Sequence, residues 1–289
     1  MIRVENVTYG YGKTSVLEDI SFTEKEPEII AIWGRNGAGK TTLMKLLSGQ
    51  EKPNKGKVEI MGMAPYNRSE AVQHVCYMQE DHPFSSIWSV KDALRFASYF
   101  YSNWDEDLTQ RLLKTFQLNE KKKVSKLSKG MKSALQFIIG ISSHAEITIL
   151  DEPSNGLDAS MRKKMYQSMR ESHEAHPRLI LLSTHHIEEI QPLCESLVVI
   201  HDKKVLLHET IDEIREYGVW LAGEKIKIEK ILDGQKPLEI YELGSSVKVM
   251  IDVPYNDEWK EIASLHGLSI EKAKLQDYLL NKTEEAEWG

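Results

Sequence analysis

The chain has 289 residues, of which 41% are hydrophobic and 28% are charged, and its formal net charge is −7. This length allows one large domain and a smaller one, and the core can be large enough to need no disulfide or metal. The negative charge argues against a general nucleic-acid binder, because such proteins are usually basic. The two cysteines, Cys76 and Cys194, have apolar neighbours and are expected to be buried thiols in a reducing compartment.

The first two thirds of the chain predict an α/β domain. Residues 1–26 alternate apolar and polar positions between glycines, which indicates short antiparallel strands. A brief apolar run follows and ends at a glycine-rich loop, after which a helix is expected. Strand and helix patterns then alternate, as in a layered domain with a parallel sheet. The expected buried strands are 28–33, 147–150, 179–183 and 197–200, and the expected helical stretches are 41–47, 89–118, 131–143, 160–174 and 185–194.

The pattern changes after about residue 208. Residues 225–231, 237–242 and 246–253 are predicted as strands, and residues 256–265 and 274–282 as helices. We therefore predict two domains, a main domain of residues 1–210 and a small α+β domain of residues 211–289. No run of residues is apolar for long enough to span a bilayer, and the N-terminus lacks the plan of a signal peptide.

A phosphate-binding loop is predicted between the first buried strand and its helix. Residues 34–41 read Gly-Arg-Asn-Gly-Ala-Gly-Lys-Thr, in which glycines let backbone N–H groups curve around an oxyanion. The positive end of the helix dipole then points at the phosphates. Lys40 is expected to reach the β- and γ-phosphates, and the Thr41 hydroxyl to hold Mg²⁺. The residues assigned to nucleotide binding here are Gly34, Arg35, Asn36, Gly37, Ala38, Gly39, Lys40, Thr41 and Thr42.

Two adjacent carboxylates, Asp151 and Glu152, follow the predicted strand 147–150. A Mg²⁺–phosphate site needs negative charge at the carboxyl end of such a strand. We expect Asp151 to act on the metal through its water shell. Glu152 could accept a proton from the attacking water.

Further motifs resemble those of the ATP-binding cassette (ABC) family, in the same order. Leu127–Met131 reads Leu-Ser-Lys-Gly-Met and resembles the signature sequence Leu-Ser-Gly-Gly-Gln. Residues 154–158 resemble the D-loop, and His185 resembles the switch histidine. Gln79 resembles the Q-loop glutamine, and Tyr11 looks like the residue that stacks on adenine. The chain is identified as a member of this family over residues 1–210.

The resemblance implies a P-loop NTPase fold with a parallel core sheet, an antiparallel β subdomain and a helical subdomain at about residues 85–143. It also implies that two cassettes meet head to tail, with each ATP between the P-loop of one and the signature of the other. Catalytic roles fall to Glu152, His185, Gln79 and Lys40, and metal binding to Thr41, Gln79 and Asp151. The signature and D-loop residues implied to face the nucleotide are Ser128, Gly130 and Asp158.

The signature departs from the family pattern at Lys129 and Met131. Ser128 and Gly130, which are tied most directly to the phosphate, are retained, so we expect an active ATPase. Ser128 is expected to begin a helix, where its hydroxyl and nearby N–H groups can face an anion. His186 and His74 are interpreted as surface residues.

The resemblance implies an ATP- and Mg²⁺-dependent motor subunit of a transporter, similar to bacterial bacitracin, lantibiotic or drug exporters. Its partners would be an integral-membrane permease and a second cassette, expected as a homodimer, with no nucleic acid. The protein would be cytoplasmic and held at the inner face of the cell membrane by the permease. The alternative is a soluble ABC ATPase that acts on ribosomes or another partner, although ribosome-acting members usually carry two cassettes and this chain has one P-loop. A non-catalytic module is a third possibility, against which the retained motifs argue.

Aromatic residues between Phe84 and Trp104 predict a docking site for the permease. Such side chains bury much area and are common in binding hot spots. Phe96 and Phe100 have the i, i+4 spacing of a helix face and are predicted to fill a core. Trp88 and the cluster of residues 99–104, which includes Tyr101, are predicted to dock the partner.

Overall fold

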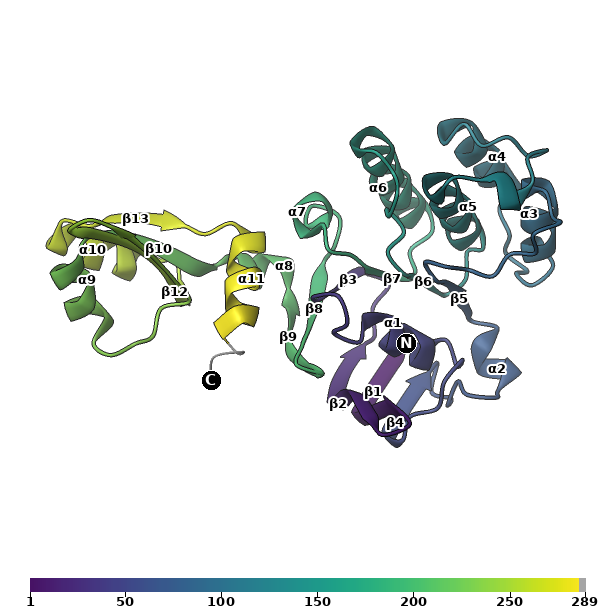
Figure 1. The fold of residues 1–289 in the computed structure, drawn as a ribbon. Helices are drawn as coiled ribbons and strands as arrows, with labels where there is room; N and C mark the ends of the chain where they lie inside the picture. Colours follow the sequence, from purple (N-terminus) through teal and green to yellow (C-terminus); the bar gives the residue numbers. More distant parts are fainter. Residues whose placement is uncertain (286–289) are drawn as a thin grey trace. The chain divides into compact units, whose positions relative to one another are not determined.

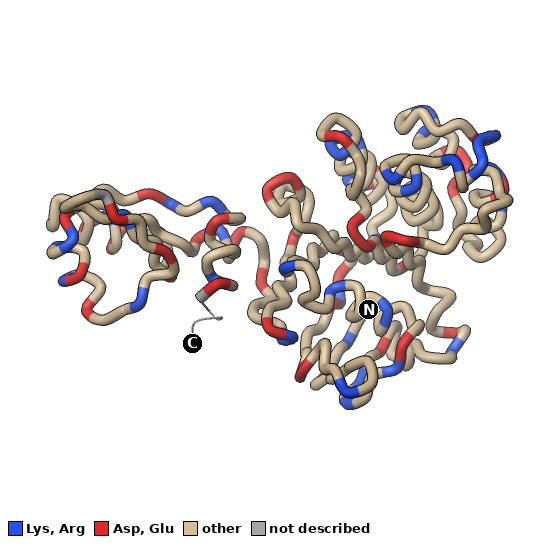
Figure 2. The backbone as a smooth tube through the Cα atoms, viewed as in Figure 1, with Lys and Arg blue, Asp and Glu red and all other residues tan. Residues whose placement is uncertain are grey.

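The computed structural model describes residues 1–285 and divides the chain into two compact units (Figure 1). The first unit runs from Met1 to His208, and the second begins at Glu209. Residues 286–289, which the sequence assigns to the predicted accessory domain, lie outside the described residues. Acidic and basic residues are mixed along both units (Figure 2). Within residues 1–285, no helix is long and apolar enough to cross a membrane.

The first unit is built on a sheet with the strand order β5-β6-β7-β3-β8-β9, in which β5 to β8 and β3 pair in parallel. Every residue of β3 is buried, as expected for a central parallel strand covered on both faces. The carboxyl ends of β3, β6 and β7 meet at one edge of this sheet, so the segments that follow them lie together. The strands are β3 (Ile29–Trp33), β5 (Val75–Met78), β6 (Ile147–Leu150), β7 (Leu179–Ser183), β8 (Ser196–His201) and β9 (Lys204–Thr210).

An antiparallel sheet with the order β2-β1-β4 packs in the same unit. Its strands are β1 (Ile2–Tyr11), β2 (Thr14–Glu24) and β4 (Lys55–Ile60). Buried and exposed residues alternate along β1, and the buried ones join a core that also contains α1 (Lys40–Leu47) and the central strands. The two elements that flank the loop between β3 and α1 are therefore anchored in this core.

The helices of the first unit differ from the prediction around residue 100. The predicted stretch 89–118 is two helices, because Asp105 caps the second one by accepting a hydrogen bond from the Leu108 N–H at 2.8 Å. A capping box between Ser89 and Asp92 begins the first one. The predicted helix 185–194 is only one turn. The remaining bounds are α2 (Ser69–Val72), α3 (Val90–Ser98), α4 (Glu106–Thr115), α5 (Lys129–Ser142), α6 (Ala159–Ala175) and α7 (Ile187–Ile190), with a 3₁₀ turn at Val124–Lys126.

The second unit is α+β. Its antiparallel sheet has the order β11-β12-β10-β13, and one face packs on α9 and α10. The predicted strand 225–231 is wrong, because these residues form α9, whose Ile228 and Leu232 are buried one turn apart. Strands β10 and β13 were not predicted. The elements are α8 (Ile211–Arg215), β10 (Tyr217–Glu224), α9 (Lys225–Leu232), β11 (Glu239–Leu243), β12 (Ser246–Pro254), α10 (Asp257–His266), β13 (Ser269–Lys272) and α11 (Leu275–Glu285).

Candidate active site

The glycine-rich loop between β3 and α1 borders a cavity of about 330 Å³. Gly39 precedes α1 with a φ of 106°, and a Cβ on it would lie 2.6 Å from the Leu17 Cδ2 atom. Both the backbone angle and the close approach therefore require glycine. The other loop residues that line the cavity are Asn36, Gly37, Lys40, Thr41 and Thr42.

Lys40 is a buried cation at the floor of this cavity. The residue is 7% exposed, and its Nζ donates to the carbonyls of Gly34 at 2.6 Å and Arg35 at 3.3 Å. The Glu152 Oε1 atom lies 4.0 Å from Nζ. Burial lowers the pKa of Lys40, and the carboxylates of Glu152 and Asp151 oppose that shift. A buried ammonium with few anionic contacts is well suited to bind phosphate oxygens.

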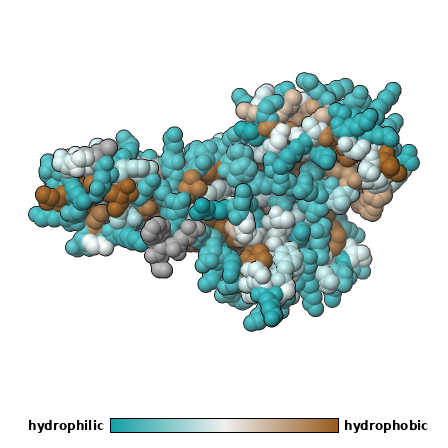
Figure 3. Space-filling model, viewed as in Figure 1, coloured by the Kyte–Doolittle hydropathy of each residue, from teal (hydrophilic) through white to brown (hydrophobic). Residues whose placement is uncertain are grey.

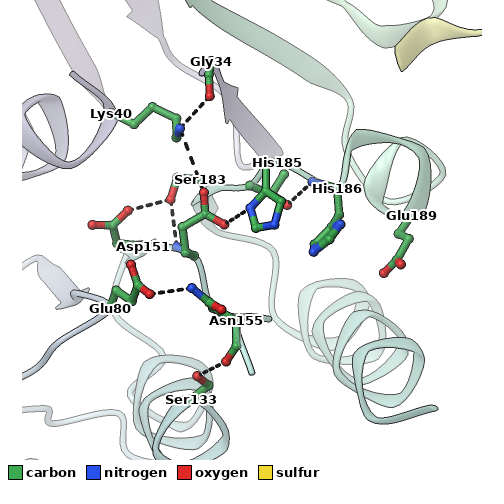
Figure 4. A network of polar contacts seen from close by, with 12 residues as sticks. Gly34, Lys40, Glu80, Ser133, Asp151, Asn155, Ser183, His185, His186 and Glu189 are labelled. Atoms are coloured by element: carbon green, nitrogen blue, oxygen red, sulfur yellow. Dashed lines mark hydrogen bonds and ion pairs between the residues drawn. The ribbon is translucent and has the colours of Figure 1, made fainter. Parts of the chain in front are cut away.

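The Asp151 carboxylate connects α1 with the end of strand β7 through two hydrogen bonds. One of its oxygens accepts from the Thr41 hydroxyl at 2.7 Å. The other accepts from the Ser183 hydroxyl at 2.6 Å (Figure 4). The Thr41 hydroxyl and the Asp151 carboxylate are oxygen ligands of the type that Mg²⁺ prefers. Thr41 and Asp151 therefore fit a magnesium site.

Glu152 is held in a strained backbone conformation with a φ of 47°. Its N–H donates to Ser183 Oγ at 2.8 Å, and its Oε2 lies 2.9 Å from Nδ1 of His185 (Figure 4). Left-handed backbone at a non-glycine residue costs about 1–3 kcal/mol and is concentrated at functional sites. The strain aims this carboxylate at Lys40 and His185, where it can accept a proton from water. The His185 ring also packs against that of His186 at 3.9 Å between centroids, a contact that the sequence did not predict.

The loop after β5 contributes Glu80 rather than Gln79. Glu80 lines the cavity, pairs with Lys129 Nζ at 2.9 Å and accepts from the Asn155 side chain (Figure 4). The Gln79 amide instead donates to its own loop, to the Asp81 carbonyl at 3.4 Å. This hydrogen bond uses the amide nitrogen and not the oxygen that would bind a metal, so the role of Gln79 at the metal stays a prediction.

The signature and D-loop residues pack against each other. Ser128 is the N-cap of α5 and accepts from the Met131 N–H at 3.3 Å, so the expectation that it begins a helix is confirmed. A Cβ on Gly130 would lie 2.3 Å from the Gly156 carbonyl oxygen, which explains why glycine stands there. Asp158 caps α6 by accepting from the Met161 N–H at 2.9 Å. Among the described residues, those lining the cavity include none of Ser128, Gly130 and Asp158.

Tyr11 stands at the end of β1 and is 47% exposed, with Tyr9 packed edge-on against it at 5.2 Å between ring centroids. An exposed ring at a strand end can stack on a planar ligand.

Comparison with known proteins agrees with this arrangement. Residues 17–155 match the family described as ABC transporter. An uncharacterized ABC transporter ATP-binding protein of Methanocaldococcus jannaschii, MJ1023, is 31% identical over 74% of this chain and 79% of its own. The chain belongs to the ABC transporter family of ATP-binding cassettes. It is an ABC ATPase with a nucleotide-binding P-loop.

Two other relatives and a solved structure extend the comparison. The cassette is 26% identical to the ABC transporter ATP-binding protein YtrB of Bacillus subtilis, over 90% of this chain and 89% of that one. It is 28% identical to the bacitracin transport ATP-binding protein BcrA of Bacillus licheniformis, over 75% and 72% of the two chains. A solved ATP-binding subunit of an ABC transporter superposes with a TM-score of 0.67 at 30% identity, over 74% of this chain and 92% of that one. The predicted fold, an α/β cassette with antiparallel and helical subdomains, is confirmed.

Several residues of the site were missed by the sequence analysis. The Ser183 hydroxyl donates to the Asp151 carboxylate and accepts from the Glu152 backbone N–H, and its signal was a buried serine at the end of a strand. Glu80 and Asn155 were missed because only the tertiary structure brings their loops together. Ser133 donates to the Asn155 carbonyl at 2.6 Å and fixes that loop on α5.

Proposed function

We propose that the cassette hydrolyses ATP to drive an ABC transporter. The arrangement of Glu152 between Lys40 and His185 is the observation that carries this proposal. Lys40 would hold the β- and γ-phosphates, and Thr41 and Asp151 would hold Mg²⁺, which supplies charge neutralisation at the phosphates. Glu152 would take a proton from the attacking water, with its carboxylate oriented by His185.

The nucleotide would be shared between two cassettes. Ser128, Gly130 and Asp158 are outside the lining of the cavity in this chain, which supports a role for them at the cavity of a second copy. The N-terminus of α5 adds backbone N–H groups and the positive end of the helix dipole, both of which favour an anion. Tyr11 would stack on the adenine of its own chain. A site completed by dimerisation couples ATP occupancy to closure.

Lys129, which departs from the usual signature, is proposed as a positioning residue. Its pairing with Glu80 fixes the loop after Gln79 on the start of α5, and that contact raises the pKa of Lys129. The Gln136 amide also donates to the Glu80 carbonyl at 2.9 Å. The Q-loop and the signature are therefore joined by an ion pair within one chain.

We predict that Lys129→Glu lowers the ATPase rate by roughly fivefold, because it puts two carboxylates in contact and releases the loop. The double variant Lys129→Glu with Glu80→Lys should recover most of that loss, measured as phosphate release in a double-mutant cycle. An unchanged rate in Lys129→Glu, or additive losses in the double variant, would contradict this role. Lys132→Glu, three residues along α5, is the matched control and should be nearly neutral.

The proposed docking surface for the permease is an aromatic ladder made of Trp88 before α3, Phe96 on α3 and Phe100 after it. Phe96 and Phe100 are 47% and 63% exposed, so the prediction that they fill a core is wrong. Phe96 packs on Trp88 at 4.7 Å and on Phe100 at 5.0 Å between ring centroids. Tyr99 is 72% exposed beside them, and apolar residues gather on the surface over α3 (Figure 3).

Tyr101 is a poorer docking residue than the sequence indicated. Its side chain is partly buried, and this burial together with the contact with Cys76 raises the pKa of its hydroxyl. Its substitution would disturb the fold. The ladder of Trp88, Phe96 and Phe100 replaces it as the surface to test.

We predict that Phe96→Ala with Phe100→Ala keeps the basal ATPase rate and reduces retention of the cassette by permease-containing membranes by about tenfold or more. The reason is that two exposed rings leave solvent only when a partner covers them. Tyr241→Ala, at 51% exposure in the second unit, is the matched control. Sedimentation with membranes from cells that express the neighbouring permease measures the retention. Wild-type retention of the double variant would move the docking surface elsewhere.

The cassette would lie at the inner face of the membrane through this permease. YtrB and BcrA are named as transporter or transport proteins, which favours transport over action on ribosomes. The second unit, proposed as an accessory domain of residues 211–289, would have a structural or regulatory role. The alignment with YtrB covers 90% of the chain and so extends into this unit.

A further inference from the structure

A second cluster of metal-ligand side chains lies where three helices of the first unit begin or end. Asp105 is the N-cap of α4, His144 follows α5, and His176 is the C-cap of α6. One ligand atom from each lies within 4.8 Å of the other two. The three border a cavity of about 200 Å³ that Glu171 also lines. None of them belongs to the ATP site.

Asp105 is held so that one oxygen remains available. Its Oδ1 atom accepts from the Leu108 N–H at 2.8 Å, and its N–H donates to the Ser142 carbonyl at 2.9 Å. The Oδ2 atom lies 3.9 Å from Nε2 of His144. The cap and the backbone contact fix the carboxylate in front of the imidazole.

The His144 ring presents a buried nitrogen to this space. Its Nε2 atom has no hydrogen-bond partner among the described residues, since 3.9 Å is too long for a hydrogen bond. The His144 side chain is 11% exposed, so this nitrogen is largely shielded from water as well as unbonded. A buried, unbonded nitrogen facing a carboxylate is costly, and a cation between the two would satisfy both. The His176 ring packs at 4.4 Å from that of His144 between centroids and is exposed, which leaves a path for entry.

We propose that Asp105, His144 and His176 bind a divalent transition-metal ion of the Zn²⁺ class. Two imidazoles and a carboxylate are a ligand set for such an ion, with water in the fourth position. Bonds of about 2.0–2.1 Å would bring tetrahedral ligand atoms to about 3.3 Å from one another. The exposed His176 side chain can move by the required amount. The positive charge of Arg178 repels a cation at this site. The negative charges of Asp105 and Glu171 offset that repulsion.

The ion would join the start of α4 to the ends of α5 and α6. Asp105 and His144 come from the helices around the signature, whereas α6 follows the D-loop. Binding would therefore stabilise the packing of these helices, and metal removal would lower the Tm of the cassette. The site does not depend on the proposed transport function.

Co²⁺ is the probe, because its visible absorption reports nitrogen and oxygen ligands in tetrahedral geometry. Tag-free, metal-stripped full-length protein is titrated in excess Mg²⁺, which occupies oxygen-rich sites in preference. We expect one equivalent of Co²⁺ to produce saturable tetrahedral bands that Zn²⁺ displaces, and Zn²⁺ to raise the Tm. Absence of saturable bands in the wild-type protein would overturn the proposal.

The variants are chosen to preserve the fold. Asp105→Asn keeps a good N-cap, and His144→Asn suits the left-handed φ of 44° at that position. Each of these, and His176→Gln, should weaken Co²⁺ binding by more than about tenfold. The matched control is His173→Ala, also on α6. The His173 ring contacts the Pro27 carbonyl outside the proposed site, so this variant should bind Co²⁺ as the wild-type protein does. Full binding in His144→Asn, or equal loss in His173→Ala, would refute the site.

Discussion

Glu152→Gln is expected to lower the rate of ATP hydrolysis by about 10²–10⁴-fold, the usual contribution of a general base. The amide keeps the size of the side chain and can still bond to His185, which lies 2.9 Å from the carboxylate. It cannot take a proton from water. The loss should therefore fall on kcat, with nucleotide affinity nearly unchanged.

The same variant should show a longer-lived dimer. Because ATP persists in the shared site, size measurement with ATP and Mg²⁺ is expected to detect a dimer that the wild-type protein loses on turnover. Glu188→Gln, on the neighbouring helix α7, serves as a charge-matched control and should hydrolyse ATP normally. A dimer no more stable than wild type would show that either Glu152 or the two-cassette mechanism is assigned wrongly.

Lys40→Ala is expected to reduce ATPase activity by at least about 10²–10³-fold, similar to the removal of one preorganised donor at a developing charge. Lys40 is the buried cation of the cavity, held by the Gly34 and Arg35 carbonyls. Its ammonium would meet the phosphate oxygens directly. ATP affinity, measured by titration calorimetry, should fall as well.

Alanine also leaves space in the core, so Lys40→Met is the matched variant. Methionine restores most of the buried stem and none of the charge. Loss of activity in both variants, with a normal Tm in Lys40→Met, would assign the effect to charge. Full activity in a clean preparation of either variant would refute the assignment of the loop.

Local sequence was sufficient to predict an element where its hydrophobic pattern agrees with its burial in the fold. The strands 147–150 and 179–183 were predicted with the bounds that the structure has, because short apolar runs between polar ends suit a buried parallel sheet. The segment 225–231 was predicted as a strand because apolar and charged residues alternate at its start. In the fold Ile226 is 76% exposed while Ile228 and Leu232 face the core, so tertiary packing selected the helix.

Spacing alone also misassigned the aromatic side chains. Phe96 and Phe100 have the spacing of a core face, yet α3 turns its Val90, Ala93, Leu94 and Ala97 inward. The i, i+4 rule states that two side chains share a face and does not state which face is covered. The core was filled by smaller residues, and the rings were left on the surface.

The sequence by itself determined the phosphate loop and the acidic pair. Their chemistry resides in residues close together in the chain, and a glycine-rich loop between a strand and a helix has few other uses. Only the tertiary structure decided that Ser183 bridges Asp151 and Glu152, that Lys129 pairs with Glu80, and that Asp105, His144 and His176 meet. These contacts join residues 31 to 71 positions apart in the chain and are set by strand order and helix packing. No local pattern encodes which loop ends become neighbours, because that is fixed by how the whole core buries its apolar surface.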